Sequence, residues 1–216
     1  MNRLWMVVLA ATLVPVSLAQ SPAQRHFIEV VKQLEAAIPG YSSTYYDKES
    51  GVVVVRIVPR LNPKLRRLLG ERVDALSVDH ELQLPRSLAR QYAQVVRQVR
   101  LNPYLSKKPI RFAVGKYTWA QHYKWREKIY KFMGNPNSMA EYGYPDWPKG
   151  CIQSSFMRDV REDKSYVFVL KSKCDEKFFQ SFLRAIHEQL GIPTDAIGFL
   201  WLTKPFRLLD KRSHRQ

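Results

Sequence analysis

The 216-residue sequence predicts an α+β protein. Several segments carry apolar residues at helical spacing, short β-rich runs alternate with turn residues, and the same order of elements occurs twice along the chain. With 45% hydrophobic and 12% aromatic residues, the chain has enough apolar side chains to fill one large core or two small ones.

The N-terminus has the pattern of a secretory signal peptide over residues 1–19. Arg3 is followed by the apolar run LWMVVLAATLVPV, and small residues, Ser17 and Ala19, occupy the positions before the expected cleavage site. We therefore expect an exported protein, periplasmic or secreted, with no transmembrane segment in the mature chain. An uncleaved anchor is the alternative, although the apolar run is short for a membrane span.

A first half is expected over residues 20–85. A capping box at Ser21–Gln24 begins a helix that ends near Pro39-Gly40, and strands at 41–46 and 52–58 flank the turn DKESG. A short basic helix at 63–69 follows. Residues 76–84 alternate between apolar and polar side chains, which predicts a half-buried strand and completes the order α-β-β-α-β.

Residues 86–108 are expected to form a connecting segment with a helix from Ser87 to about Leu101. A strand at 109–115 then precedes a helix that begins at the capping box Thr118–Gln121 and ends near Gly134. On a helical wheel its aromatic residues occupy one half and its lysines the other, so we expect a core-facing helix with a solvated back. The inward group includes Trp119, Trp125, Ile129 and Phe132; the outward group is Lys116, Lys124, Lys128 and Lys131.

The long segment 135–150 contains three candidate binding residues, Tyr142, Tyr144 and Trp147. Loops of this length are uncommon and often functional. The alternative is that the segment folds back over its own core.

A second half is expected over residues 109–205. Strands at 151–159 and 165–173, a helix at 175–190 and a strand at 196–203 follow the helix 118–134, giving β-α-β-β-α-β, and a basic tail covers 206–216. The motifs LGERVDAL (69–76) and LGIPTDAI (190–197) match in order. We therefore expect two tandem ferredoxin-like (split βαβ) halves, arising from an internal duplication and joined by the helix 87–101.

The two cysteines, Cys151 and Cys174, lie at equal distances from the centre of the expected hairpin. An even register would place them opposite one another, at a separation that a disulfide can span. We expect this disulfide in an oxidising compartment. A nucleophilic Cys151 is the alternative.

Basic residues outnumber acidic residues by 35 to 19, giving a net charge of +16. This balance favours an anionic partner, and a solubilising surface without a specific ligand is the alternative. Two clusters supply the anion-binding candidates. They are Arg56, Arg60, Lys64, Arg66 and Arg67 in the first half, and Lys204, Arg207, Lys211 and Arg212 at the C-terminus.

The sequence contains no Gly-rich phosphate loop, no nucleophile elbow and no histidine pair at metal-ligand spacing, so we assign no catalytic residue, metal or cofactor. The expected function is non-enzymatic binding of an envelope protein or an anionic envelope polymer. One alternative is an envelope enzyme with a Cys/His or carboxylate site near 135–150. Another is a subunit of an envelope or DNA-uptake assembly, since nucleic acid would also suit the basic surface.

Overall fold

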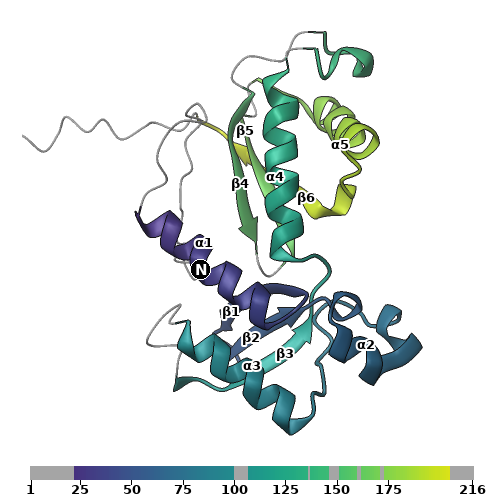
Figure 1. Ribbon diagram of the computed structural model, residues 1–216. Coiled ribbons are helices and arrows are strands. Elements are labelled where there is room, and N and C mark those ends of the chain that lie inside the picture. The colour runs from purple at the N-terminus through teal and green to yellow at the C-terminus, as the bar shows by residue number, and fades with distance from the viewer. Residues whose placement is uncertain are drawn as a thin grey trace, which may run out of the picture. The chain divides into compact units, whose positions relative to one another are not determined.

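The computed structural model describes residues 22–99, 107–135, 137–145, 151–159, 162–170 and 173–204, and it is an α+β structure with two three-stranded sheets (Figure 1). The expected signal peptide and the tail 206–216 lie outside these residues. The chain divides into an N-terminal unit, residues 15–124 with 160–163, and a C-terminal unit that includes 125–159 and 164–216. Each unit is described by itself.

The N-terminal unit is built on the sheet β1-β2-β3, in which β1 and β2 are antiparallel and β2 and β3 are parallel. Its elements are α1 (Pro22–Ala37), β1 (Tyr41–Asp47), β2 (Val52–Ile57), the 3-10 turn η1 (Pro59–Leu61), α2 (Pro63–Leu69), the 3-10 turn η2 (Gly70–Asp74), α3 (Arg86–Gln98) and β3 (Ile110–Val114). The helix α1, the hairpin β1-β2 and the helix at 63–69 are thus confirmed.

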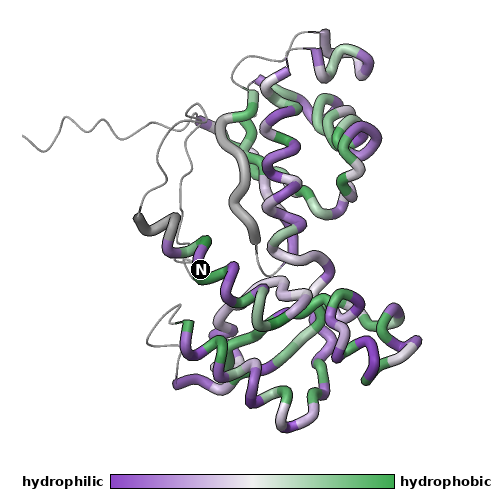
Figure 2. Tube along the Cα trace, in the orientation of Figure 1, coloured by the Kyte–Doolittle hydropathy of each residue, from purple (hydrophilic) through white to green (hydrophobic). Residues whose placement is uncertain are grey.

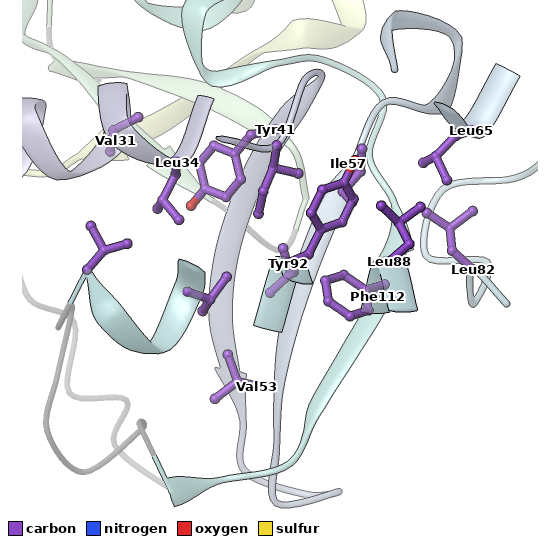
Figure 3. Close-up of a cluster of buried hydrophobic side chains, with 14 of the residues drawn as sticks. Val31, Leu34, Tyr41, Val53, Ile57, Leu65, Leu82, Leu88, Tyr92 and Phe112 are labelled. Atoms are coloured by element: carbon purple, nitrogen blue, oxygen red, sulfur yellow. The ribbon is translucent and has the colours of Figure 1, made fainter. Parts of the chain in front are cut away.

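The core of this unit lies between the helices and one face of the sheet, as Figure 3 shows. Alternate residues of β2, Val53, Val55 and Ile57, point into it because side chains on a strand alternate between faces. Leu34 of α1 and Tyr92 of α3 are at most 1% exposed and pack against them. The apolar residues at helical spacing on α1 and α3 and the alternate residues of β2 therefore form one core cluster.

The strand expected at 76–84 does not form. Only Glu81 makes an isolated antiparallel bridge, with Ala113 of β3. Asp79 adopts a left-handed φ of 68°, which interrupts an extended chain. Val78 is 40% exposed and His80 is also exposed, whereas Leu82 is buried and Leu76 and Leu84 pack against the core, so only part of the alternating face is buried.

The third strand of the N-terminal sheet is instead β3, which the sequence had suggested as the first strand of the second half. The helix α3, expected to connect two halves, lies between β2 and β3 in the chain and so forms the crossover between these parallel strands. A parallel pair needs such a crossover.

The C-terminal unit has a sheet of the same order, β4-β5-β6, with β4 and β5 antiparallel and β5 and β6 parallel. Its elements are most of α4 (Trp119–Gly134), the 3-10 turn η4 (Ala140–Tyr142), β4 (Ile152–Asp159), β5 (Lys164–Leu170), α5 (Glu176–Leu190), the 3-10 turn η5 (Thr194–Ala196) and β6 (Ile197–Leu202). Asp175 caps α5 by accepting from the Phe178 N–H, and Gly191 ends it with φ 64°.

The core of the C-terminal unit is rich in phenylalanine. Phe178, Phe179 and Phe182 of α5 are at most 1% exposed. They pack with Ile129 and other residues of α4 and with alternate β5 residues such as Val167. The ring of Phe182 meets that of Phe132 edge-on, with 6.1 Å between centroids. Each unit thus has its own apolar core.

Helix α4 begins at the predicted capping box. The Thr118 N–H donates to Gln121 Oε1 at 2.8 Å, and the Gln121 N–H donates to Thr118 Oγ1 at 3.1 Å. The helix also has the two faces that were expected. Ile129 and Phe132 are buried, Trp119 and Trp125 are half-buried, and the outward lysines Lys124, Lys128 and Lys131 are exposed.

Hydrophilic and hydrophobic residues share the helices of both units (Figure 2). In keeping with this mixture, none of the helices described here is both long enough and apolar enough to cross a bilayer.

A disulfide joins Cys151 to Cys174, with 5.6 Å between the two Cα atoms. The expected direct opposition across the hairpin is wrong, because β4 carries register irregularities and Ile152 pairs with Val169. Cys174 lies beyond the end of β5, and its N–H donates to the Leu170 carbonyl. The bond therefore fastens the turn before α5 to the beginning of β4.

Candidate anion-binding surface

Helix α2 is held in place by Asn62, its buried N-cap residue. The Asn62 Oδ1 accepts from the N–H groups of Lys64 and Leu65, both at 3.1 Å, and satisfies donors that a helix start leaves open. Its Nδ2 donates to the Pro39 carbonyl at 2.8 Å and to the Tyr92 hydroxyl at 3.0 Å. One side chain thus ties α2 to the chain before β1 and to α3.

Five cations surround this anchored helix and form what we call the α2 surface: Arg60, Lys64, Arg66, Arg67 and Arg72. All five are exposed. Leu65 alone of the α2 leucines is fully buried, while Leu68 is 49% exposed. Glu71 and Asp74 are the exposed acidic residues of the adjoining turn η2. The surface is therefore net positive, with apolar side chains among its cations.

A groove of about 370 Å³ lies where α2 faces the first turns of α3. Lys64, Arg67 and Leu68 line one side, and the other side is formed by Pro85, Ser87, Leu88 and Gln91. The Lys64 ammonium donates to Gln91 Oε1 at 3.3 Å across it. The beginning of a helix carries partial positive charge and open N–H donors. Two cations and a helix start therefore favour an anion at this groove.

Arg56 does not belong to this surface. It is 1% exposed, and its Nε and Nη2 donate to the two carboxylate oxygens of Asp79 at 2.7 and 2.5 Å. Its guanidinium also lies 5.1 Å from the centroid of the Tyr45 ring. Burial raises the pKa of the Tyr45 hydroxyl, although Arg56 opposes the shift. Arg56 thus fixes Asp79 to the sheet. Because it is buried and paired, we exclude it from the anion-binding residues.

The remaining basic candidates cluster at the C-terminus. Lys204 is exposed just beyond β6. Arg207, Lys211 and Arg212 lie outside the described residues.

The two described aromatic candidates of the segment 135–150 pack onto the C-terminal unit. The Tyr144 ring meets Phe178 edge-on at 5.0 Å. The Tyr142 hydroxyl donates to Glu188 Oε2 at 2.9 Å, and burial together with this carboxylate raises the pKa of Tyr142. Both contacts agree with a segment that folds back over its own core. Trp147 lies outside the described residues.

A buried polar cluster in the N-terminal unit surrounds Asp163. Its Oδ2 accepts from the N–H groups of Lys116 and Tyr117 at 2.7 and 3.1 Å, and its Oδ1 lies 3.4 Å from both Ser42 Oγ and His122 Nε2. The side chains of Ser42, His122 and Asp163 are at most 4% exposed. A substrate cannot reach this Ser-His-Asp set, so we interpret it as structural.

This cluster was missed by sequence reasoning, which treated residues 160–164 only as a hairpin turn. Asp163 has a φ of 55°, a conformation that Asp tolerates better than most residues. Gly115 completes the fit, since a Cβ there would lie 2.6 Å from the Ser42 Cβ. The only local feature of the sequence that could have indicated this cluster was an Asp in a turn.

Metal-ligand groups and free thiols are both missing from the described residues. They contain no group of three His, Cys, Asp or Glu residues placed to hold a metal ion. Both cysteines are in the disulfide, so neither provides a thiol nucleophile. No protein-family model, curated protein or solved structure matches this chain.

Proposed function

We propose that the protein is an exported, non-enzymatic binding protein that holds an anionic polymer of the cell envelope on its α2 surface. The observation that carries this proposal is the gathering of five exposed cations around one firmly anchored helix, beside a groove at the start of α3. Phosphate groups along a polymer match several separated cations at once. The net charge of +16 attracts such a polymer over a longer range.

Export rests on the signal-like residues 1–19 and agrees with the disulfide, because disulfides persist in oxidising compartments. N-terminal sequencing of the protein recovered from its producing cells should begin at Gln20. Protein that retains Met1 would contradict cleavage.

We also infer that the two units arose by duplication of a ferredoxin-like half that lacks its first strand. The support is the shared order α-β-β-α-β and the identical pairing of both sheets. Because the N-terminal unit ends with β3, the related segments are α1 to β3 and α4 to β6. Crystal structures of both segments that superpose element by element would support this descent, whereas different handedness of the two crossovers would contradict it.

The binding proposal is tested by comparing two double variants with the same change in net charge. Lys64→Glu with Arg67→Glu reverses two cations that line the groove, and Arg90→Glu with Arg97→Glu reverses two exposed cations elsewhere on α3. The probes are heparin and a phosphodiester polymer, duplex DNA, titrated at several salt concentrations.

The groove variant should lower the salt dependence of DNA binding by about two phosphate contacts, since each contact contributes about 0.9 to the logarithmic slope. The α3 variant should weaken binding modestly through long-range charge, with an unchanged slope. Equal effects of the two variants would show that only net charge matters and would overturn the assignment of the α2 surface.

A further inference from the structure

The third strand of each sheet lies at a sheet edge, but the two edges differ. In the N-terminal unit, residues 79–82 run along the outer edge of β3. The Asp79 N–H donates to the Val114 carbonyl, the Val114 N–H donates to the His80 carbonyl, and the Leu82 N–H donates to the Phe112 carbonyl, each at 2.9 Å. These bonds pair the outward N–H and C=O groups of Val114 and the outward C=O group of Phe112.

The corresponding edge of β6 has no such cover in the part of the chain that the structure describes. β6 pairs with β5 alone, in parallel register from Ile197 to Leu202. Its sequence, IGFLWL, is apolar throughout, and Trp201 is 38% exposed. An unpaired apolar strand edge is a template for another strand, and proteins usually block it with a charge, a proline or a cover. None of these devices lies within β6 itself.

The direction of the open backbone groups follows from the N-terminal unit. In β3, Phe112 and Val114 point their side chains into the core and their backbone groups outward. In the C-terminal unit, β6 likewise runs parallel to the middle strand β5. The preferred right-handed crossover places α5 on the same face of this sheet that α3 occupies on the N-terminal sheet. Phe199 and Trp201, whose rings contact Phe179 of α5, therefore present their N–H and C=O groups outward.

The cover on β3 also indicates what an occupant of β6 looks like. The cover is a short segment that continues from the left-handed turn at Asp79. It carries two exposed acidic residues, Glu81 and Asp79, the second of which pairs with Arg56, and it buries one apolar side chain, Leu82. Next to β6, Lys204 is exposed. A second copy of this chain would bring two charges of +16 together, which opposes self-pairing.

We propose that the outer edge of β6 binds an extended acidic segment of a partner protein, which adds to the sheet as a fourth, antiparallel strand. Backbone hydrogen bonds to Phe199 and Trp201 supply the affinity in this mode, and side chains at alternate positions supply the specificity. The edge requires a peptide because only a peptide backbone offers matching donors and acceptors. This partner site is separate from the α2 surface.

The test uses the isotope-labelled full chain and a synthetic peptide with the sequence of residues 76–84, LSVDHELQL, as the probe. Amide resonances of residues 197–202 should shift on titration to about 1 mM peptide. A peptide with lysine in place of both acidic residues should bind about tenfold more weakly at low salt. A peptide methylated on the nitrogen of its second leucine, the Leu82 equivalent, should lose binding.

A matched pair of variants tests the backbone contact. Trp201→Ala and Trp201→Pro lose the same indole ring, but only the proline variant also loses the outward N–H. Binding of LSVDHELQL should survive in the alanine variant and fall by about tenfold in the proline variant. Proline is tolerated at an edge position whose N–H faces solvent; if Trp201→Pro unfolds by circular dichroism, that N–H points into the sheet and the proposal is wrong.

Three other outcomes would also overturn the proposal. They are peptide-induced shifts around Ala113 instead of β6, no shifts at residues 197–202 at the highest peptide concentration, and shifts at β6 that follow protein concentration without peptide. The last would identify a second copy as the occupant.

Discussion

The two units share a framework and differ in one connection. In both, the middle strand leads to a helix and then to a parallel third strand. In the N-terminal unit the link from β2 to α3 runs from Ile57 to Arg86, whereas in the C-terminal unit the link from β5 to α5 runs only from Leu170 to Glu176. The long link contains α2 and the cover 79–82. The short link contains Cys174.

This difference shows that the link, and not the framework, determines what each unit exposes. The long link supplies the cations of the α2 surface and closes the edge of β3. The short link is too brief to reach the edge of β6, and a disulfide fastens it to the start of β4. The N-terminal unit therefore has a basic surface and a covered edge at β3, and both features come from the longer link. Among the described residues, the C-terminal unit has an uncovered edge at β6.

The largest expected effect tests whether the two cores are separate. Phe182→Ala, at a fully buried position, should cost about 3–5 kcal/mol, and Leu34→Ala should cost about 2–5 kcal/mol. Native-state hydrogen exchange should localise the first loss to α5 and β5 and the second to α1 and β2. If either variant reduced the protection of both sets of amides equally, the two units would unfold together, and their cores would not be energetically separate.

Much of this framework could be predicted from the sequence, because it depends on local patterns. Apolar spacing identified α1 and α5, β-rich runs on either side of turn residues identified the hairpins, and the capping box at Thr118 placed the start of α4. The disulfide was also predicted, although its register was wrong. Irregularities in β4 shift the pairing, and no local pattern revealed them.

The misassigned parts depend on contacts between distant residues. Residues 76–84 alternate like a strand, yet Asp79 turns away to bind Arg56, which is 23 positions earlier. The candidate site was predicted in part. Exposed cations such as Lys64 and Arg67 were identified from charge alone, whereas the burial of Arg56 depends on its tertiary ion pair. Charge in a sequence does not distinguish an exposed cation from a paired one.

The next effect concerns the short link of the C-terminal unit. Replacing both cysteines by serine, or adding a reductant, should destabilise that unit by about 3 kcal/mol, the loop-closure value for a bridge of this span. Denaturation followed by the exchange of α5 amides measures the loss, and α1 amides provide the internal control. Unchanged exchange of the α5 amides would mean that packing alone holds the short link in place.

A smaller effect concerns the anchor of the long link. Asn62→Ala should cost about 2 kcal/mol, because it removes the cap of α2 and leaves buried partners without their hydrogen bonds. Tyr92→Phe removes only the hydroxyl that Asn62 contacts and should cost about 1 kcal/mol. Thermal denaturation of both variants measures the difference. Equal losses would show that the Tyr92 contact carries the whole effect and that the α2 cap contributes nothing.

The smallest effect compares the basic residues of the two units. Lys128 and Lys131 are exposed on α4 in the C-terminal unit, and Lys128 donates to the Leu190 carbonyl at 3.0 Å. Replacing both by alanine should change the free energy of unfolding by less than about 0.5 kcal/mol, because exposed contacts of this kind contribute little. It should also leave the salt slope of DNA binding unchanged. The same double alanine change at Lys64 and Arg67 should reduce that slope, since those cations line the groove beside α3. If the α4 variant reduced the slope as much as the groove variant, the polymer would contact both units. Binding would then not be specific to the α2 surface that the long link supplies.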